Sequence, residues 1–127
     1  MQRYPETPES FALAQKLAKE VDADLILGSD PDADRVAIQV KGKDGAYVQI
    51  SGNQTGVLLL DYLIGAKKRA GTLPDRPVAL KSLVTTDLAR VVAEANGVES
   101  YNTFTGFKFM AEKKNQLEAA GQGHISC

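Results

Sequence analysis

The spacing of apolar residues changes along the chain, and each change predicts a different element. From Phe11 to Val21 apolar residues recur three and four positions apart, which predicts a helix with one face in the core. Shorter apolar runs at 25–27, 36–40 and 47–50, the last two joined by a glycine-bearing turn, predict a strand followed by a β-hairpin. The expected core face of the helix consists of Phe11, Leu13, Ala14, Leu17, Ala18 and Val21.

A second half begins at residue 51, where polar, glycine-bearing sequence at 51–56 predicts a hinge and cap before a strongly apolar helix. Strands and helices then alternate, which predicts a parallel sheet with right-handed crossovers and a ligand site beyond the carboxyl ends of its strands. The fold class is therefore expected to be α/β, with mixed sheets and alternating β and α elements, in two domains, 1–50 and 51–127. The expected elements of the second half are a helix at 57–70, a strand at 77–84, a helix at 88–96, a strand at 98–103 and a helix at 105–119.

Composition and charge are those of an ordinary globular protein. Of the 127 residues 43% are hydrophobic and 24% are charged, and fifteen basic against sixteen acidic residues leave a net charge of −1. So small a charge gives no field that attracts nucleic acid, and no apolar stretch is long enough to span a membrane, so neither partner is expected. The single cysteine, Cys127, cannot form a disulfide within the chain, which favours a reducing, cytoplasmic location.

Three carboxylates at alternate positions follow the first predicted strand. Asp30, Asp32 and Asp34 would point the same way in an extended segment, and a modest curl would bring them to a common point. Grouped carboxylates stay ionised when a cation lies among them, and all-oxygen ligands suit a hard cation such as Mg²⁺. Arg35 comes next and could hold a phosphoryl oxygen. The pattern predicts a Mg²⁺ site for phosphate chemistry, with a solvated acidic turn as the plainer alternative.

Two other metal-dependent motifs share this spacing. An EF-hand loop requires Gly and Glu where this chain has Arg35 and Lys41, so that interpretation fails. A haloacid-dehalogenase-like phosphatase also ends an apolar strand in D-x-D, with the first carboxylate, here Asp30, as the nucleophile. That interpretation stays open on the local residues.

Two lysines lie near the expected carboxyl ends of strands in the second half. Lys81 interrupts an apolar strand, which is costly for an ammonium group unless it emerges at an edge or meets an anion. Lys108 falls in the first turn of a helix, where a cation gains nothing from the helix dipole. Both are candidates for anion binding, and a snorkelling or surface lysine explains each about equally well. Residues 85–87 are expected to cap the helix that follows them.

Three motifs together carry a family resemblance. They are Asp30-Pro31-Asp32-Ala33-Asp34-Arg35, then 51–56 before an apolar helix, and then Thr105-Gly106-Phe107-Lys108-Phe109. In this order, and spanning almost the whole chain, they resemble the α-D-phosphohexomutase superfamily, nearest its phosphoglucomutase members. The resemblance implies a four-domain parent, of which this chain would be a fragment carrying the end of the second, metal-binding domain and most of the third, sugar-binding domain.

The resemblance also implies roles for individual residues. Asp30, Asp32 and Asp34 match the family's metal ligands, and Arg35 matches the arginine that contacts the reacting phosphoryl group. Lys81 and Lys108 fall where family members place active-site lysines. Mg²⁺ is the implied cofactor, a sugar phosphate is the implied substrate, and the remaining domains of the parent enzyme are the implied partners.

The family's nucleophile is not in this sequence, because no serine is followed by His-Asn, and the sugar-reading E-E-S-x-G loop is expected beyond Cys127. The chain alone is therefore expected to be inactive. The intact parent is expected to interconvert glucose 1-phosphate and glucose 6-phosphate through an enzyme phosphoserine and a bisphosphate intermediate. Phosphomannomutase and phosphopentomutase are the alternatives within the family, and the phosphatase and a non-catalytic metal-binding module are the alternatives outside it.

Overall fold

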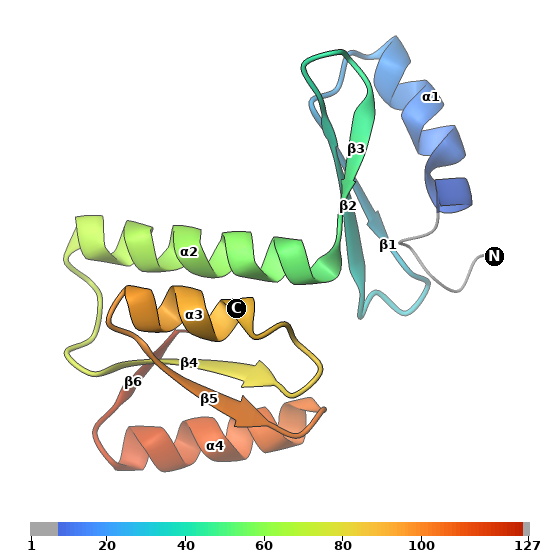
Figure 1. The fold of residues 1–127 in the computed structure, drawn as a ribbon. Helices are drawn as coiled ribbons and strands as arrows, with labels where there is room; N and C mark the ends of the chain where they lie inside the picture. Colours follow the sequence, from blue (N-terminus) through green and yellow to red (C-terminus); the bar gives the residue numbers. More distant parts are fainter. Residues whose placement is uncertain (1–7, 126–127) are drawn as a thin grey trace. The chain divides into compact units, whose positions relative to one another are not determined.

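The structure, a computed structural model, describes residues 8–125, and the chain forms two compact units, 1–55 and 56–127. Both units combine helices with strands, and in the second unit the two alternate along the chain (Figure 1), which confirms the predicted α/β class. Among the helices of the described residues, none is both long and apolar enough to cross a membrane.

The first unit is a helix packed on a three-stranded antiparallel sheet. A 3₁₀ turn at Pro8–Phe11 leads into α1, Ala12–Glu20. The sheet has the order β1-β2-β3, and Leu27 pairs with Ile38 at the middle of its first ladder. Its strands are β1 at Leu25–Ser29, β2 at Val36–Lys41 and β3 at Tyr47–Ile50.

The core of the first unit lies between α1 and one face of this sheet. Phe11 of the 3₁₀ turn and Ala18 of α1 pack with Ile26 and Ala37 of the strands, and all four are buried. Gly28 packs closely beneath Phe11, since a Cβ there would lie 3.2 Å from the Phe11 ring, which would have to shift slightly. Side chains alternate along each strand, so the neighbours of these residues point to the other face of the sheet.

The prediction that the whole apolar stripe of α1 is core was wrong. Leu13, Leu17 and Val21 are exposed, Leu13 to 80%. At about 100° per residue the six stripe positions cover an arc of roughly 160°, which is wider than the contact that one helix makes with a flat sheet. Only the half of the arc around Phe11 and Ala18 meets the strands, and the other half is left in solvent.

The face of the sheet opposite α1 is apolar and, among the residues that the structure describes, exposed. It is formed by the strand residues that alternate with the buried ones, and these are large aliphatic side chains exposed to at least a third of their area. They are Leu25, Leu27, Val36, Val40 and Val48. This apolar side of the β1-β2-β3 sheet results from the continuous apolar runs of its strands, which place large side chains on both faces.

The long helix α2, Gly52–Ala70, begins five residues earlier than predicted. Its start is a reciprocal cap: the Ser51 backbone N–H donates to Gln54 Oε1 at 2.9 Å, and the Gln54 N–H donates to Ser51 Oγ at 3.2 Å. The polar stretch at 51–56 was expected to be a hinge and a cap. It does cap the helix, and it also forms the first turns of the helix itself.

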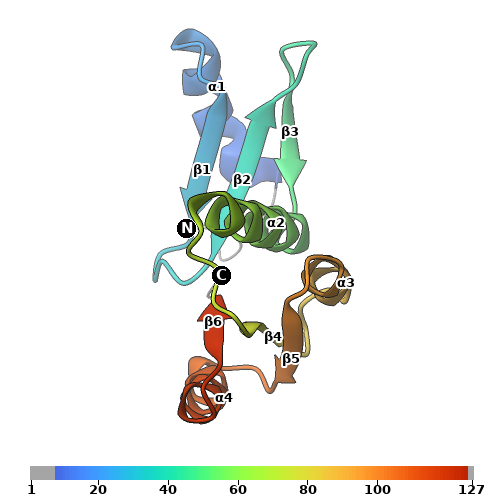
Figure 2. The same ribbon diagram turned by 90° about the vertical axis from the view of Figure 1, so that its left-hand side faces the viewer.

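The second unit is a parallel sheet between helices. The sheet has the order β5-β4-β6, and α2 and α3 lie on one face of it while α4 lies on the other (Figure 2). Its elements are β4 at Pro77–Ser82, α3 at Leu88–Ala95, β5 at Glu99–Thr103, α4 at Phe107–Ala119 and β6 at Gly123–Ile125. The short β6 was not predicted from the sequence.

One buried cluster joins α2 and α3 to β4 and β5. It consists of Leu60, Ile64, Ala79, Ala89, Ala93 and Val98. Small alanines at the helix–strand contacts let the backbones approach closely, while Ile64 fills the centre with no exposed area. The carboxyl ends of β4 and β5 lie side by side, because the two strands pair in parallel from Val78 with Glu99 to Ser82 with Thr103. The buried cluster holds this pair of strands against the helices.

Candidate functional site

The loop that joins β1 to β2 brings the three acidic residues together. Ser29 pairs with Val36, so residues 30–35 close a tight connection between adjacent antiparallel strands. The Ala33 N–H donates to the Asp30 carbonyl at 3.0 Å, and Ala33 has a positive φ of 58°. A left-handed residue in the middle of the loop turns the chain back on itself, which supplies the curl that the sequence analysis required.

The resulting arrangement is a cluster of three carboxylates. Asp30, Asp32 and Asp34 each offer an oxygen, and these oxygens lie within 4.8 Å of one another. Asp30 is buried, whereas Asp32 and Asp34 are exposed. In the octahedral geometry of Mg²⁺, with metal–oxygen bonds of about 2.1 Å, neighbouring ligand oxygens lie about 3 Å apart and opposite ones about 4.2 Å apart, so the side chains need to close by no more than about 2 Å. The donor set and the spacing therefore fit a hard divalent cation.

Arg35 contributes to this cluster through its backbone and through its side chain. Its backbone N–H donates to Asp30 Oδ1 at 3.2 Å. Its Nε lies 3.8 Å from Asp30 Oδ2 and 4.0 Å from Asp34 Oδ1, while the guanidinium group remains half exposed. The loop thus has one positive group beside three negative ones, with a charged face still open to solvent.

The proton affinities of two of these carboxylates move in opposite directions. Burial by itself raises the pKa of Asp30, but hydrogen bonds from the Arg35 N–H and from the Asp34 and Asp32 side chains outweigh it, and the pKa lies below its ordinary value. The pKa of Asp34 is raised, first by its side-chain hydrogen bond to Asp30, then by burial and by the charges of Asp32 and Asp30. Without a cation, Asp34 is therefore the more easily protonated of the two, as expected for like charges held together.

Lys81 lies at the carboxyl end of β4, in the second unit, and its ammonium group is buried. The side chain is 7% exposed, Nζ donates to the Thr85 carbonyl at 3.0 Å, and it lies 3.2 Å from Asp87 Oδ1. Residues 85–87 were expected to cap α3. The Leu88 N–H donates to Thr86 Oγ1 at 3.3 Å, but the Asp87 side chain makes no capping hydrogen bond. The carboxylate pairs with the lysine instead, because a buried ammonium without a counter-ion is far more costly than an uncapped helix end.

Lys108 lies in the first turn of α4, just beyond the carboxyl end of β5. It is exposed, and the residue before the helix, Gly106, has a φ of 121° that favours glycine. Phe104 and Phe109 stack edge to face with ring centroids 5.6 Å apart, which pins the loop on either side of this turn. Lys81 and Lys108 thus lie at the same edge of the sheet, on segments that lead to helices on opposite faces.

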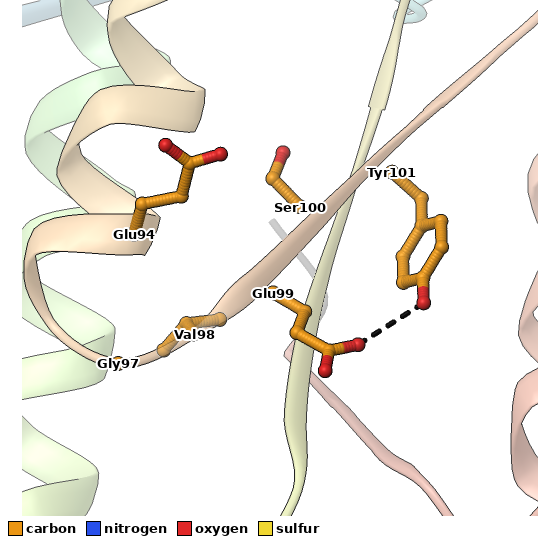
Figure 3. Close-up of a pocket in the computed structure, with 6 residues that line it drawn as sticks. All are labelled: Glu94, Gly97, Val98, Glu99, Ser100 and Tyr101. Carbon is orange, nitrogen blue, oxygen red and sulfur yellow. Dashed lines mark hydrogen bonds between the residues drawn. The ribbon is translucent and has the colours of Figure 1, made fainter.

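A separate open cavity of about 510 Å³ lies at the other end of β5 (Figure 3). Tyr101 Oη donates to Glu99 Oε2 there at 3.0 Å, and this bond raises the pKa of Tyr101. The sequence analysis missed this cavity, because its lining comes from a turn and a strand edge that carry no motif. It contains none of the predicted site residues and is lined by Glu94, Gly97, Val98, Glu99, Ser100 and Tyr101.

Two family models match the chain, and they share one family name. Residues 2–43 match the phosphoglucomutase/phosphomannomutase alpha/beta/alpha domain II, and residues 51–124 match domain III of the same family. The two matches leave few residues of the chain uncovered. The carboxylate cluster lies in the first match, and both candidate lysines lie in the second.

Curated relatives agree with these matches. Proteins named phosphoglucomutase from Staphylococcus epidermidis and Staphylococcus aureus are 38% identical over 113 and 114 residues, which is 89% and 90% of this chain. The chain spans about a fifth of their length, since the matched region is 20% of each relative.

Solved structures share the fold at lower identity. A phosphoglucomutase/phosphomannomutase family protein from Burkholderia thailandensis superposes with a TM-score of 0.58 at 20% identity, covering 95% of this chain and 24% of that one. An N-acetylglucosamine-phosphate mutase of the α-D-phosphohexomutase superfamily, in its apo form, superposes with a TM-score of 0.53 at 15% identity. The match covers 88% of this chain and 27% of that one. The resemblance noted in the sequence is confirmed, and the chain belongs to the phosphoglucomutase/phosphomannomutase family.

Proposed function

We propose that the protein to which this chain belongs is a phosphoglucomutase that interconverts glucose 1-phosphate and glucose 6-phosphate. A phosphoserine elsewhere in the parent would give its phosphoryl group to the free hydroxyl of the sugar monophosphate and form a bisphosphate. The other phosphoryl group of that bisphosphate would then return to the serine, so the phosphate moves and the enzyme is restored. The observation that carries this proposal is the convergence of three carboxylates beside Arg35 at the end of β1.

In this proposal Asp30, Asp32 and Asp34 hold a Mg²⁺ ion, for which their oxygen donors and their spacing are suited. When bound, the ion supplies charge neutralisation for the phosphoryl group in transfer. Arg35 orients that group through its half-exposed guanidinium, since a planar fork of donors fits phosphoryl oxygens. Its backbone N–H keeps Asp30 in place at the same time.

Lys81 and Lys108 are proposed to bind the anionic substrate from the second unit. Both lie at the carboxyl edge of a parallel sheet, which is where such sheets bind ligands. The names of the curated relatives favour glucose phosphate as the substrate, with mannose phosphate and pentose phosphate as the alternatives. A sugar phosphate, the other domains of the parent and a cytoplasmic location complete the proposal.

The experiment that tests it compares the full-length protein with this chain. The full-length protein is expected to convert glucose 1-phosphate to glucose 6-phosphate faster than it converts mannose 1-phosphate or ribose 1-phosphate, and the chain alone is expected to be inactive. Preference for another sugar phosphate would replace the substrate but keep the reaction class.

Two other results would reject the reaction class. Hydrolysis of a generic phosphoester by this chain alone, abolished in Asp30→Asn, would support the phosphatase with Asp30 as nucleophile. Absence of any Mg²⁺ binding in calorimetry, with glucose 6-phosphate present and with the full-length protein inactive, would leave a non-catalytic module.

A further inference from the structure

The ion pair between Lys81 and Asp87 joins two groups with very different environments. The lysine side chain is 7% exposed and the aspartate side chain is 75% exposed, although their charged atoms are 3.2 Å apart. The buried member is fixed by the sheet, and the exposed member belongs to the residue just before α3. The lysine is therefore shielded from water and depends on a counter-ion, whereas the aspartate is hydrated.

The position of the ammonium group follows from the alternation of β4. Ala79 points into the cluster formed with α2 and α3, so Lys81, two residues later, emerges on the same face at the end of that core. Its Nζ reaches the Thr85 carbonyl at 3.0 Å, within the turn that leaves the strand. The lysine therefore has one fixed polar partner that does not depend on Asp87.

The turn that receives the lysine is itself held by several hydrogen bonds. The Thr85 N–H donates to the Ser82 carbonyl at 3.1 Å, and the hydroxyl groups of the same two residues lie 3.1 Å apart. The Leu83 N–H donates to the Thr103 carbonyl at 2.9 Å, which ties this turn to the end of β5. Rotation of the Asp87 side chain breaks none of these bonds.

The two charges lose different amounts when they separate. A buried ammonium group must keep a counter-ion, because desolvation penalises an unpaired charge heavily. A carboxylate that is three-quarters exposed is already hydrated, and a surface ion pair gains it little. Lys81 therefore requires an anion, but nothing in its surroundings requires that the anion be Asp87.

We propose that Asp87 is a displaceable counter-ion, which neutralises Lys81 in the free protein and yields its place to a phosphate group of the ligand. This inference rests on the proposed function and deepens it, because it makes Asp87 a positioning residue for the anion site at the end of β4. The site lies beside the end of β5, at the sheet edge that also carries Lys108. Asp87 pairs with the lysine and holds it in place, and it also competes with the incoming phosphate for it.

The experiment titrates the 127-residue chain with inorganic phosphate at constant ionic strength and follows backbone amide resonances by NMR. Phosphate is expected to shift the amides of Lys81, Leu83 and Thr85. In Asp87→Asn the dissociation constant for phosphate is expected to fall at least about threefold, because the competing carboxylate is gone. In Asp87→Glu, which keeps the competing charge, it is expected to stay close to the wild-type value.

A matched control removes the same charge elsewhere. Asp75 is exposed and precedes β4, at the end of the strand away from Lys81, so Asp75→Asn should leave the phosphate affinity unchanged. An Asp87→Asn variant that binds phosphate no more tightly than Asp75→Asn would overturn the proposal, as would an Asp87→Glu variant that matches Asp87→Asn. Phosphate that shifts none of the three amides in any variant would also overturn it.

Failure here is distinguishable from failure of the proposed function. The titration reports on residues of the second unit only, whereas Mg²⁺ binding reports on the carboxylate loop of the first. Loss of the phosphate effect with intact Mg²⁺ binding and intact mutase turnover in the full-length protein would reject the role of Asp87 alone. Absence of Mg²⁺ binding and of turnover would reject the proposed function instead.

Discussion

Asp30 and Asp32 differ in what they contribute to the carboxylate loop. Asp30 is buried and accepts the Arg35 N–H, so its carboxylate holds the loop together as well as facing the other two acids. Asp32 is exposed, so its side chain contributes little to the packing of the unit. A substitution at Asp32 should therefore separate the proposed chemistry from folding.

Asp32→Ala in the full-length protein is expected to lower mutase turnover on the order of a thousandfold or more, because a metal ion contributes several kcal/mol to phosphoryl transfer. Its stability in urea should change little, since an exposed side chain is removed. The control is Asp61→Ala, which removes an exposed carboxylate from α2 and should leave turnover near normal. A nearly active Asp32→Ala enzyme would contradict the metal site.

Tyr101 provides a pH-dependent signal away from this loop. Its hydrogen bond to Glu99 stabilises the protonated phenol and raises the pKa of Tyr101, with burial and the charge of Glu99 adding to the effect. A tyrosine in the unfolded chain has a pKa of about 10. Because the pKa of Tyr101 is raised in the folded chain, this residue stabilises the fold at pH values below about 10, and that stabilisation is lost as the pH rises through the raised pKa.

Glu99→Gln is accordingly expected to lower the pKa of Tyr101. The measurement is the ultraviolet absorbance of tyrosinate during an alkaline titration, with Tyr101→Phe subtracted to isolate this residue from the other tyrosines. Glu94→Gln, in the same cavity, is the control and should leave the Tyr101 titration unchanged. An unchanged titration in Glu99→Gln would show that another group sets this pKa.

At the scale of elements, the turn from β1 to β2 depends on the left-handed backbone of Ala33. A left-handed conformation costs a residue with a Cβ roughly 1–2 kcal/mol, and glycine avoids that cost. Ala33→Gly is therefore expected to raise the free energy of unfolding of the first unit by up to about 1 kcal/mol. Ala33→Val should lower it by about 1 kcal/mol or more, since β-branched residues tolerate a positive φ poorly.

Urea unfolding followed by circular dichroism would measure both variants. Lys16→Gly, at an exposed position inside α1, is the contrasting control, because glycine in a helix costs about 1 kcal/mol. The glycine effects at 33 and at 16 should therefore have opposite signs. A loss of stability in Ala33→Gly comparable with that in Lys16→Gly would mean that the turn does not bear this strain.

The comparison of sequence with structure is most informative for these elements. The period of apolar residues correctly predicted α1, the hairpin and the βαβα order, because burial on one face imposes that period wherever the element packs. It could not predict which half of the wide α1 stripe meets the sheet, since this depends on the orientation of the strands below. The early start of α2 was missed because the cap was expected next to Val57, at the end of the polar stretch, whereas Ser51 and Gln54 form it at the beginning.

The candidate site was predictable to different degrees. The convergence of Asp30, Asp32 and Asp34 was predicted from their alternate positions, because it requires only a local curl of the loop. The partner of Lys81 was not predicted, because a Thr-Thr-Asp sequence before a helix normally indicates a cap. The domain boundary at 50/51 stays a prediction, and the two compact units meet at Thr55 and Gly56.

At the scale of the whole molecule, each unit has its own buried cluster. Ile26 is in the cluster of the first unit and Ile64 is in that of the second. Ile26→Ala is expected to destabilise only the first unit and Ile64→Ala only the second, each by about 2–5 kcal/mol, the usual cost of emptying a buried site. Residue-resolved hydrogen exchange would measure both, and a loss of protection in both units from either variant would mean that the clusters unfold together.

The apolar side of the β1-β2-β3 sheet also decides how the isolated chain can be handled. A contiguous aliphatic surface of this kind favours association and binds hydrophobic dyes. Anilinonaphthalene sulfonate fluorescence should rise with the chain and fall in a Leu27→Thr, Val48→Thr double variant, whereas Val84→Thr, outside this surface, should leave it unchanged. Preparations of the chain should accordingly precipitate as they are concentrated, and mild detergent should keep them dispersed.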